Sequence, residues 1–531
     1  MNHFRISRLG AAALLALSAA LPALAQEPVS GGTLTVAADT EPRNLNPAIV
    51  ASNGVFYLSS KIVEPLAEMD YDTGLKPLLA TAWEGSDDGL TFTVTLRDGV
   101  TWSDGEPFTS ADVAFSAMEI WKPLQNIGGQ IFADLTAVET PDDTTAIFKF
   151  SKPVPAQLIE NAMPAVTAVL PKHLLEGKDL AEAEYNTAPV GTGPFVFGEH
   201  RPGEFYQLVK NDSYWGEGLP YLDEIVYRVL PDAGAKAAAL ETGDVQVTAF
   251  SAVPLTDLER LDAIDGISVI PEGYEGITYN IVLEMNNETP ELAKPEVRQA
   301  LAYAIDKDFL VDVVFMGYAT AATGPVPPTD PLFYTDDVPA YDFDTDKAEA
   351  LLDEAGYPRG DDGTRFSLRL RPAPWFEQTR AAGDYVRQAL GKVGIDVEIV
   401  TADPGGHIAA VYTDHDYDLA IGSPVYRNDP AISTTILYQG GLAAGIPFAN
   451  QYGYDSADMN ALIAKGQSTL DPDARVEVYK EFQELAQTDL PILFLTHFTF
   501  ITVARDEVKN VANNPRWATG NWADTWIQPT E

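Results

Sequence analysis

Cysteine is absent from this chain of 531 residues. Its absence excludes disulfide bonds, thiol nucleophiles and a lipid anchor on a mature N-terminal cysteine. Histidine is also scarce, with six residues, and none of them forms the HExxH spacing of zinc peptidases. The GxSxG elbow of serine hydrolases is missing as well. We therefore predict no catalytic residues and no cofactor, and we expect a protein that is not an enzyme.

The chain has few basic residues. Lysine and arginine together number 34 against 78 acidic residues, which gives a formal net charge of −44. The negative electrostatic potential of such a chain disfavours nucleic acid and anionic membranes as partners. The acidic residues are spread along the chain, which favours a strongly solvated surface, suited to a saline habitat, over an acidic docking face.

Long hydrophobic runs are limited to the first 25 residues. Arg5 and Arg8 precede an apolar stretch over residues 9–21, and Ala23 and Ala25 supply the small residues that a signal peptidase reads. We predict a signal peptide over residues 1–25, with cleavage near Ala25. No later run reaches the length of a spanning helix, so we expect an exported periplasmic protein without direct membrane insertion.

The rest of the chain indicates an α/β protein of more than one lobe. A single hydrophobic core rarely grows beyond roughly 250–300 residues, so two large lobes are expected. Residues 33–37 alternate as a strand, and Thr109 with Asp112 forms a capping-box pattern that begins a helix. Amphipathic patterns at 295–317, 346–356 and 383–394 end at glycines, and a strand is predicted at 395–400.

Two polar clusters are candidates for metal sites, and neither has the spacing of one. His407 and His415 lie in a loop rich in aspartate before an apolar strand. Asp342, Asp344 and Asp346 begin like a calcium loop, but Lys347 replaces the glycine that the sixth position needs. We predict no metal site.

The stretch PVGTGPF at 189–195 brackets a threonine with two glycines. It lacks the GxGxxG pattern and the Lys-Ser or Lys-Thr pair of a phosphate loop, and Pro194 blocks a helix after it. We interpret it as a turn.

Seven motifs together resemble those of the extracellular solute-binding proteins of the peptide/nickel type, family 5, which feed ATP-driven importers. The resemblance covers nearly the whole mature chain. The motifs are EPRNLNP (41–47), VEPL (63–66), LTFTVTLRDGVTWSDGEPFTSADVAFS (90–116), PVGTGPF (189–195), PEVRQALAYAIDKD (295–308), DKAEALLDEAGYP (346–358) and VRQALGKVGIDVEI (386–399).

The resemblance implies an α/β, two-lobe type II periplasmic binding protein fold with two hinge crossings, near residues 277–283 and 493–503. Lobe I would span 31–276 with an extra subdomain at about 68–189. Lobe II would span 277–495, and residues 496–531 would return to lobe I. In this family PVGTGPF closes the extra subdomain and feeds a strand.

The resemblance also implies where a ligand binds. Dipeptide-binding members carry an acid three residues before an Asp-Pro, and here that position is Tyr426, ahead of Asp429. They carry an arginine two residues before an aromatic residue, whereas here Ala373 precedes Trp375 and Arg371 stands two residues away. We predict ligand contacts from Tyr426, Arg427, Asp429, Trp375, Phe376, Arg371, Asn53 and Asn280.

A zwitterionic dipeptide would lack its charge partners at such a site, so we expect weak binding of free dipeptides unless Asp429 or Asp39 takes the ammonium. Either Arg371 or Arg427 would hold an anion. The predicted function is capture of a peptide or peptide-like solute by a monomer that delivers it to an inner-membrane ABC permease. The alternatives are a non-peptide solute (opine, oligosaccharide or metal chelate), a secreted hydrolase or metalloprotein using His407 and His415, and a structural surface protein.

Overall fold

The computed structural model describes residues 27–38, 41–42, 44–50, 52–181 and 183–529. The predicted signal peptide and Asp39 lie outside the described residues. None of the helices in the described part has both the length and the apolar character to cross a membrane.

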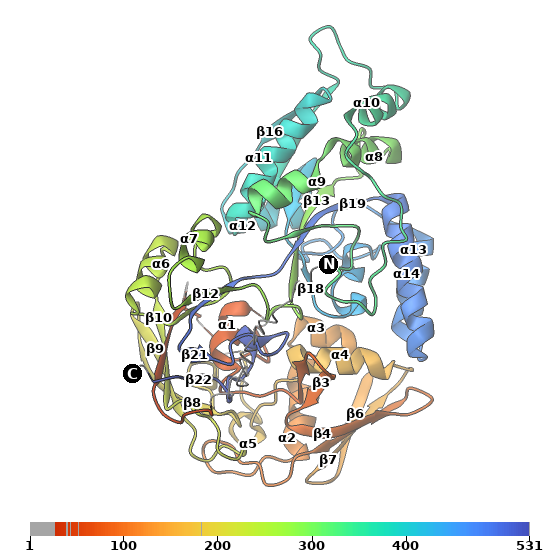
Figure 1. Ribbon diagram of the computed structural model, residues 1–531. Coiled ribbons are helices and arrows are strands. Elements are labelled where there is room, and N and C mark those ends of the chain that lie inside the picture. The colour runs from red at the N-terminus through yellow and green to blue at the C-terminus, as the bar shows by residue number, and fades with distance from the viewer. Residues whose placement is uncertain (1–26, 39–40, 43, 51, 182, 530–531) are drawn as a thin grey trace, which may run out of the picture.

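The first large sheet combines strands from both ends of the chain (Figure 1). β1 is its centre and runs parallel to β10 and β11, so the alternating residues of β1 are covered on both sides of the sheet. The strand order is β12-β20-β11-β1-β10-β9-β8. Their bounds are β1 Thr33–Ala38, β8 Phe195–Arg201, β9 Phe205–Lys210, β10 Glu224–Val229, β11 Val247–Thr248, β12 Ile267–Ile270 and β20 Thr502–Arg505, with helices α1 Asn53–Ser59, α6 Ala233–Thr242 and α7 Leu258–Asp262.

A four-stranded antiparallel sheet, in the order β4-β5-β7-β6, is inserted between β1 and β8. Asp112 accepts a hydrogen bond from the backbone N–H of Thr109 at 2.9 Å, so the predicted capping box does begin helix α2. The elements are β4 Ala80–Gly85, β5 Thr91–Leu96, β6 Leu135–Asp142, β7 Thr145–Phe150, α2 Ser110–Phe115, α3 Asn126–Ile131, α4 Ala156–Val166 and α5 Lys172–Leu175.

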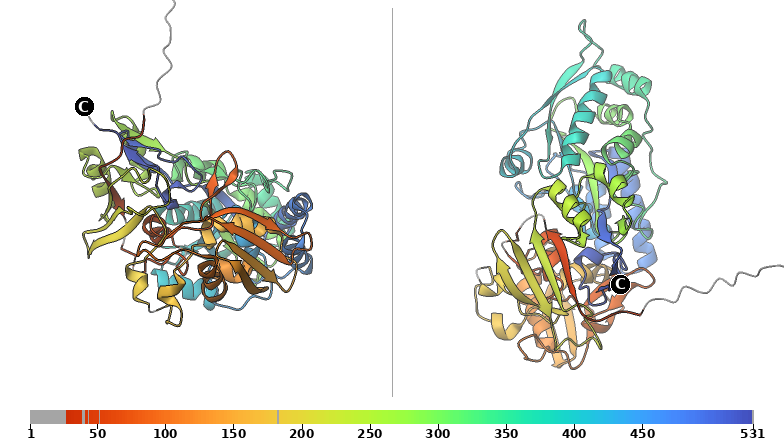
Figure 2. Two further views of the ribbon diagram at one scale, coloured as in Figure 1. Left: turned by 90° about the horizontal axis from the view of Figure 1, so that it is seen from below. Right: turned by 60° about the vertical axis from the view of Figure 1, so that its left-hand side comes forward.

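The second large sheet stands above the other two with its own helices, as the right-hand view of Figure 2 shows. Its order is β14-β19-β13-β17-β15-β16, and β18 also pairs with β13. The strands are β13 Thr278–Met285, β14 Thr320–Ala321, β15 Phe366–Pro372, β16 Ile395–Ile399, β17 Leu419–Gly422, β18 Val425–Tyr426 and β19 Ile492–Phe498. The helices are α8 Pro295–Ala304, α9 Lys307–Phe309, α10 Thr345–Glu354, α11 Glu377–Lys392, α12 Pro404–Ile408, α13 Ala457–Ser468 and α14 Pro472–Asp489.

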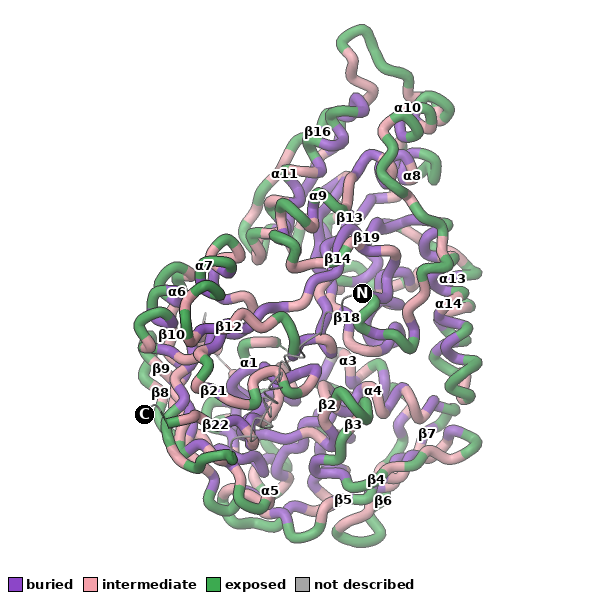
Figure 3. Tube along the Cα trace, viewed as in Figure 1, coloured by how far each residue is buried: buried purple, intermediate pink, exposed green. Residues whose placement is uncertain are grey.

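The chain crosses between the two large sheets twice, at 271–277 and at 499–501. β12 pairs with β20 in the first sheet, and β13 pairs with β19 in the second. The tube along β13 and β19 is almost continuously buried (Figure 3). The two crossings therefore lie next to each other and join the two sheets with their helices, which we call the first and the second lobe after their sheets. One hydrophobic cluster of buried residues runs through both lobes.

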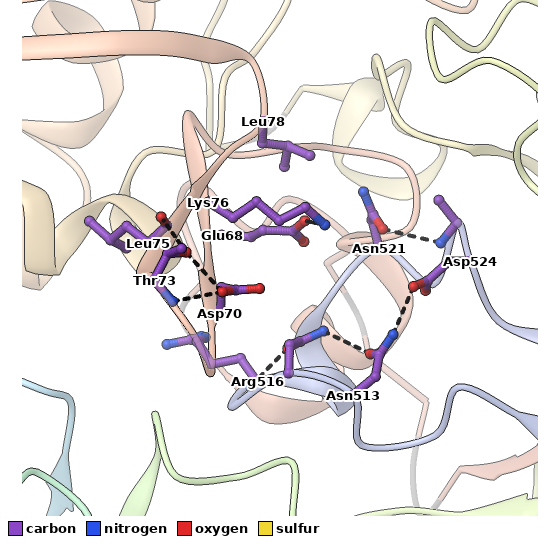
Figure 4. A network of polar contacts seen from close by, with 12 residues as sticks. Glu68, Asp70, Thr73, Leu75, Lys76, Leu78, Asn513, Arg516, Asn521 and Asp524 are labelled. Carbon is purple, nitrogen blue, oxygen red and sulfur yellow. Dashed lines mark hydrogen bonds and ion pairs between the residues drawn. The ribbon is translucent and has the colours of Figure 1, made fainter.

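The C-terminal segment packs against the hairpin of β2 (Ala67–Asp70) and β3 (Gly74–Pro77), as Figure 4 shows. Lys76 pairs with Glu68 at 3.0 Å, and the pKa of Lys76 is raised first by Glu68 and also by Asp524. Asn513 donates to Asp524 at 2.7 Å, close to the short pair β21 Val508–Lys509 and β22 Trp526–Ile527.

The turn at 189–194 packs tightly on the end of the α1 segment. The N–H of Gly193 donates to the carbonyl oxygen of Ile62 at 2.9 Å, and Thr192 donates to Glu64 at 3.0 Å. Glu64 also accepts from Tyr214, Trp215 and Asn521. The glycines therefore allow two backbone segments to touch, and the interpretation of this stretch as a turn is confirmed. Helix α1 ends at Ser59, five residues before Glu64.

A buried ion pair lies where the inserted subdomain meets the second lobe. Arg475 of α14 forms two hydrogen bonds with Asp429, at 2.7 and 2.8 Å, and both side chains are fully buried. Two residues of α4 reach the same pair: Asn161 donates to Asp429 at 2.9 Å, and Gln157 accepts from Arg475 at 3.0 Å. Polar contacts thus join the two lobes away from the crossings.

The turn at Gly191 gives a first prediction. A Cβ at this position would collide with the carbonyl oxygen of Ile62, which belongs to the backbone and cannot move aside cheaply. Gly191→Ala should lower the free energy of unfolding by roughly 1–3 kcal/mol or more, measured by urea unfolding. Gly391→Ala is the control, because a Cβ there meets nothing within 4 Å on helix α11. The control should be neutral or slightly stabilising, and equal behaviour of the two variants would contradict the packing argument.

The Asp429–Arg475 pair gives a second prediction. Arg475→Met leaves the carboxylate of Asp429 buried without its partner, so stability should fall by roughly 3–5 kcal/mol. Arg387→Met removes an exposed arginine that pairs with Asp384, and it should change stability by less than about 1 kcal/mol. Urea unfolding of both variants distinguishes these outcomes. A loss below 1 kcal/mol for Arg475→Met would mean that the pair is not needed for folding.

Candidate ligand-binding site

A cavity of about 720 Å³ lies between the two lobes. One wall comes from the segment before α1 and from α3 with the loop before it, and the other comes from β13, the end of β15 and the chain around β18. The described residues that line it are Ile49, Val50, Ser52, Asn53, Leu124, Ile127, Gln130, Tyr279, Trp375, Phe376, Ser423, Pro424, Val425, Arg427, Ile432, Ser433, Ile436, Pro447 and Phe448. A smaller cavity of about 210 Å³ shares Asn53 and Phe376 with it.

Aromatic rings form much of the second-lobe wall. Trp375 follows the end of β15, and its indole N–H donates to the hydroxyl of Ser423 at 2.7 Å, which fixes the ring. Phe448 stands perpendicular to Trp375 at 5.6 Å between centroids. The backbone of Phe448 has φ 58°, a left-handed conformation that is unusual for an aromatic residue. This wall can stack on a flat or apolar part of a ligand.

Asn53 and Tyr279 meet across the cavity. The side-chain amide of Asn53, at the start of α1, donates to the hydroxyl of Tyr279 on β13 at 3.1 Å. The first residue belongs to the first lobe and the second to the second lobe, so this hydrogen bond depends on the distance between the lobes. A ligand in the cavity can contact both walls at once.

Arg427 brings a positive charge to the cavity wall. It is half-buried, and burial lowers its pKa. Its charge lies close enough to the hydroxyl of Tyr279 to lower the pKa of that phenol, against the larger opposing effect of burial. Within the described part of the chain, the guanidinium of Arg427 has neither an ion pair nor a hydrogen bond. It is therefore available to an anionic group of a ligand.

Two predicted site residues lie on the opposite face from the cavity. Tyr426 is 1% exposed and donates its hydroxyl to Asp330 at 2.6 Å. Asn280 is fully buried, donates to the carbonyl oxygen of Pro424 and contacts His497 at 2.6 Å. Neither residue is among those that line the cavity, and their predicted contacts with a ligand stay a prediction. The two-residue period of a strand explains the placement: Tyr279 pairs with Val425 and both line the cavity, while Asn280 and Tyr426 follow them on the other face.

Arg371 and Asp429 are also not among the described residues that line the cavity. Arg371 lies on β15 opposite Ala420 and donates to the carboxylate of Asp416 at 2.7 Å and to its carbonyl at 2.6 Å. Asp429 is engaged by Arg475. Both side chains have charged partners within the protein. Of the eight predicted residues, the cavity brings together Arg427, Trp375, Phe376 and Asn53, whose contacts with a ligand stay a prediction.

The side chains of the polar loop that contains His407 and His415 do not point toward a common centre that could hold a metal ion. His407 packs perpendicular to Trp375 at 5.1 Å, and burial, followed by Arg371, lowers its pKa to about 4. His415 contacts Gln451 at 3.1 Å instead. Asp344 caps helix α10 by accepting from the N–H of Lys347 at 2.9 Å. The described residues contain no group of three or more acidic or histidine side chains arranged to hold a metal ion.

Burial raises the pKa of several carboxyl groups, and the two with the highest values, Glu64 and Glu284, are not among the residues that line the cavity. Burial raises the pKa of Glu64 to about 7, although four side chains donate to it. Burial raises the pKa of Glu284 to about 8, and Tyr412 donates to it at 3.3 Å. Perturbed acids can serve catalysis when they face a substrate. These two face protein interior, where they organise packing.

Several cavity residues were not predicted from the sequence. Tyr279 could have been found by asking which neighbour of Asn280 shares a face with Val425, but that requires the strand register. Phe448, Leu124 and Ile127 come from segments far apart in the chain and carry no motif. Only the folded arrangement places them together.

The comparisons with known proteins agree with this geometry. Residues 74–444 match the model of the bacterial extracellular solute-binding proteins, family 5 Middle. The oligopeptide-binding protein AppA of Bacillus subtilis is 29% identical over 486 residues, covering 89% of this chain and 87% of AppA. The dipeptide-binding protein of Escherichia coli K12 is 28% identical over 509 residues, covering 92% and 93%.

Among solved structures, AgaA of A. tumefaciens R10 in complex with agropinic acid has a TM-score of 0.77 and 26% identity, covering 94% of this chain and 99% of AgaA. The mixed α/β arrangement with its two lobes is the type II periplasmic binding protein fold, as the sequence motifs predicted. The family model covers well over half of the sequence, and the chain belongs to the bacterial extracellular solute-binding proteins of family 5.

Proposed function

We propose that this protein is the solute-binding component of an ABC importer, and that it captures a peptide or peptide-like solute between its lobes and delivers it to an inner-membrane permease. The observation that carries the proposal is the cavity walled by both lobes, with the Asn53–Tyr279 hydrogen bond across it. A ligand that contacts both walls stabilises the closed arrangement of the lobes. The relatives that bind oligopeptides and dipeptides support the peptide class.

The two adjacent crossings at 271–277 and 499–501 would act as the hinge. Opening would separate Asn53 from Tyr279 and α4 from the Asp429–Arg475 pair. We propose that the protein works as a monomer in the periplasm and binds without catalysing a reaction, since the cavity wall holds no assembled nucleophile and base among the described residues.

A non-peptide solute is the second candidate. It is favoured by one observation: the described wall offers no carboxylate to a peptide ammonium. The relative AgaA was solved with agropinic acid, which supports ligands other than peptides.

Native mass spectrometry of the protein purified from its own periplasm tests the ligand class. We expect a bound species with the mass and fragmentation of a short peptide or an amino-acid conjugate. A bound sugar or metal chelate would refute the peptide class and leave the transport role intact. Hydrolysis of peptides by the pure protein, lost in His415→Ala, would refute the binding role itself.

Tryptophan fluorescence tests where that ligand binds. Adding the species identified by mass spectrometry should change the emission of the wild type, because Trp375 lies on the cavity wall. Trp375→Phe should remove most of the change. Trp83→Phe is the control, since Trp83 lies on β4 in the inserted subdomain. If Trp375→Phe responds like the wild type, the ligand binds elsewhere.

A further inference from the structure

Arg427 stands out among the buried cations of this protein. The other arginines that the second sheet and α14 bury have acidic partners: Arg371 pairs with Asp416 at 2.7 Å, and Arg475 with Asp429 at 2.7 Å. Arg427 has no such partner among the described residues, in a chain with 78 acids and 34 bases. A partly desolvated charge without a partner is costly to keep. The anion that offsets this cost is therefore expected from outside the chain.

A second arginine increases the demand for an anion. Arg516, in the C-terminal segment, is 6% exposed and packs beside Gly276 in the first crossing. Burial, followed by the charge of Arg427, lowers the pKa of Arg516 to about 9. Its guanidinium also has no ion pair within the described part of the chain. Arg516 does not line the cavity, but its positive charge adds to the local potential around Arg427 and so favours an anion there.

The rest of the described wall offers no negative charge to a cation. Of the described residues that line the large cavity, Arg427 alone carries a charge, and the others are apolar, aromatic or neutral polar. A primary ammonium entering this space would lose its hydration and meet a like charge without a carboxylate to replace the water. A carboxylate would meet the guanidinium instead. The wall therefore discriminates between ligands by charge.

The volume of the cavity and its aromatic rings indicate the size and the apolar character of the ligand. A cavity of about 720 Å³ is in the usual range for a small-molecule site. Trp375 and Phe448 offer ring faces and edges, while Leu124 and Ile127 supply an apolar surface from the first lobe. A short, partly apolar molecule with one anionic end fits this composition.

We infer that the solute is an anion without a free amino group at this wall, such as an N-acylated amino acid or an N-blocked short peptide, and that Arg427 binds its carboxylate. This inference rests on the proposed function and narrows the solute to anions. Tyr426 takes no direct part, because its hydroxyl is engaged by Asp330 in the core. The selectivity follows from Arg427 and from the lack of a described acid on the wall.

Titration calorimetry of the full mature protein with three probes of one shape tests the inference. The probes are N-acetyl-Ala-Phe, an anion; Ala-Phe, a zwitterion; and N-acetyl-Ala-Phe amide, which is neutral. The anion should bind at least tenfold more tightly than the other two. Arg427→Gln should weaken binding of the anion roughly 10- to 150-fold, the cost of one charge-assisted hydrogen bond, and the neutral amide less than threefold.

Two controls separate this effect from misfolding and from net charge. Arg427→Gln should unfold at the same temperature as the wild type or higher, because it removes a charge without an internal partner. Arg387→Gln, on the exposed face of α11, removes one positive charge away from the cavity and should leave the preference unchanged. Asp39→Asn tests an acid outside the described residues and should leave the weak binding of Ala-Phe unchanged.

The inference would be overturned if Ala-Phe binds as tightly as N-acetyl-Ala-Phe or more tightly. It would also be overturned if Arg427→Gln still prefers the anion over the other two probes. Failure of all three probes to bind would also overturn it, because it predicts capture of a small carboxylate. The importer role would still stand in that case if native mass spectrometry finds another solute in the protein. The two failures are therefore distinguishable.

Discussion

The pairing of β12 with β20 in one sheet, and of β13 with β19 in the other, is the constraint on which the rest of the structure depends. The same two chain segments supply a pair of strands to each sheet, so the lobes are tied together by two short adjacent connections. Each lobe therefore has its own ladder of backbone hydrogen bonds, and the two short connections carry the chain from one sheet to the other.

The first lobe and its insertion depend on a different kind of contact. Glu64 is buried and accepts hydrogen bonds from four side chains, which come from the glycine turn, from the loop after β9 and from the C-terminal segment. Its neighbours Lys61 and Ile62 receive the N–H groups of Phe195 and Gly193. Lys61 is itself buried against the ring of Trp522 at 4.0 Å. One short stretch of chain thus gathers the segments that close the insertion, and glycine is required where backbones touch.

The cavity uses both of these features. The segment before α1 reaches it from the first lobe, and the cluster at Glu64 follows the other end of that helix. The second lobe contributes Tyr279 and Arg427 through β13 and the chain after β18, next to the crossing. The described wall of the site therefore contains one cation, several rings and neutral polar groups, and both lobes contribute to it.

The sequence by itself determined local features, because helix starts and close backbone contacts depend on single residues: the glycines at 191 and 193, the capping box at Thr109 and the Pro295 start of α8 all hold in the structure. The resemblance of its motifs to family 5 implied the fold, and it pointed to some of the segments that line the cavity. It did not determine which side chains face the cavity. Neighbouring residues on a strand point to opposite faces, so Tyr426 and Arg427, or Asn280 and Tyr279, can be told apart only by the register of β13 with β18. Partners far apart in sequence decided the rest: Asp416 engages Arg371 and Arg475 engages Asp429, while Arg427 is left facing the cavity.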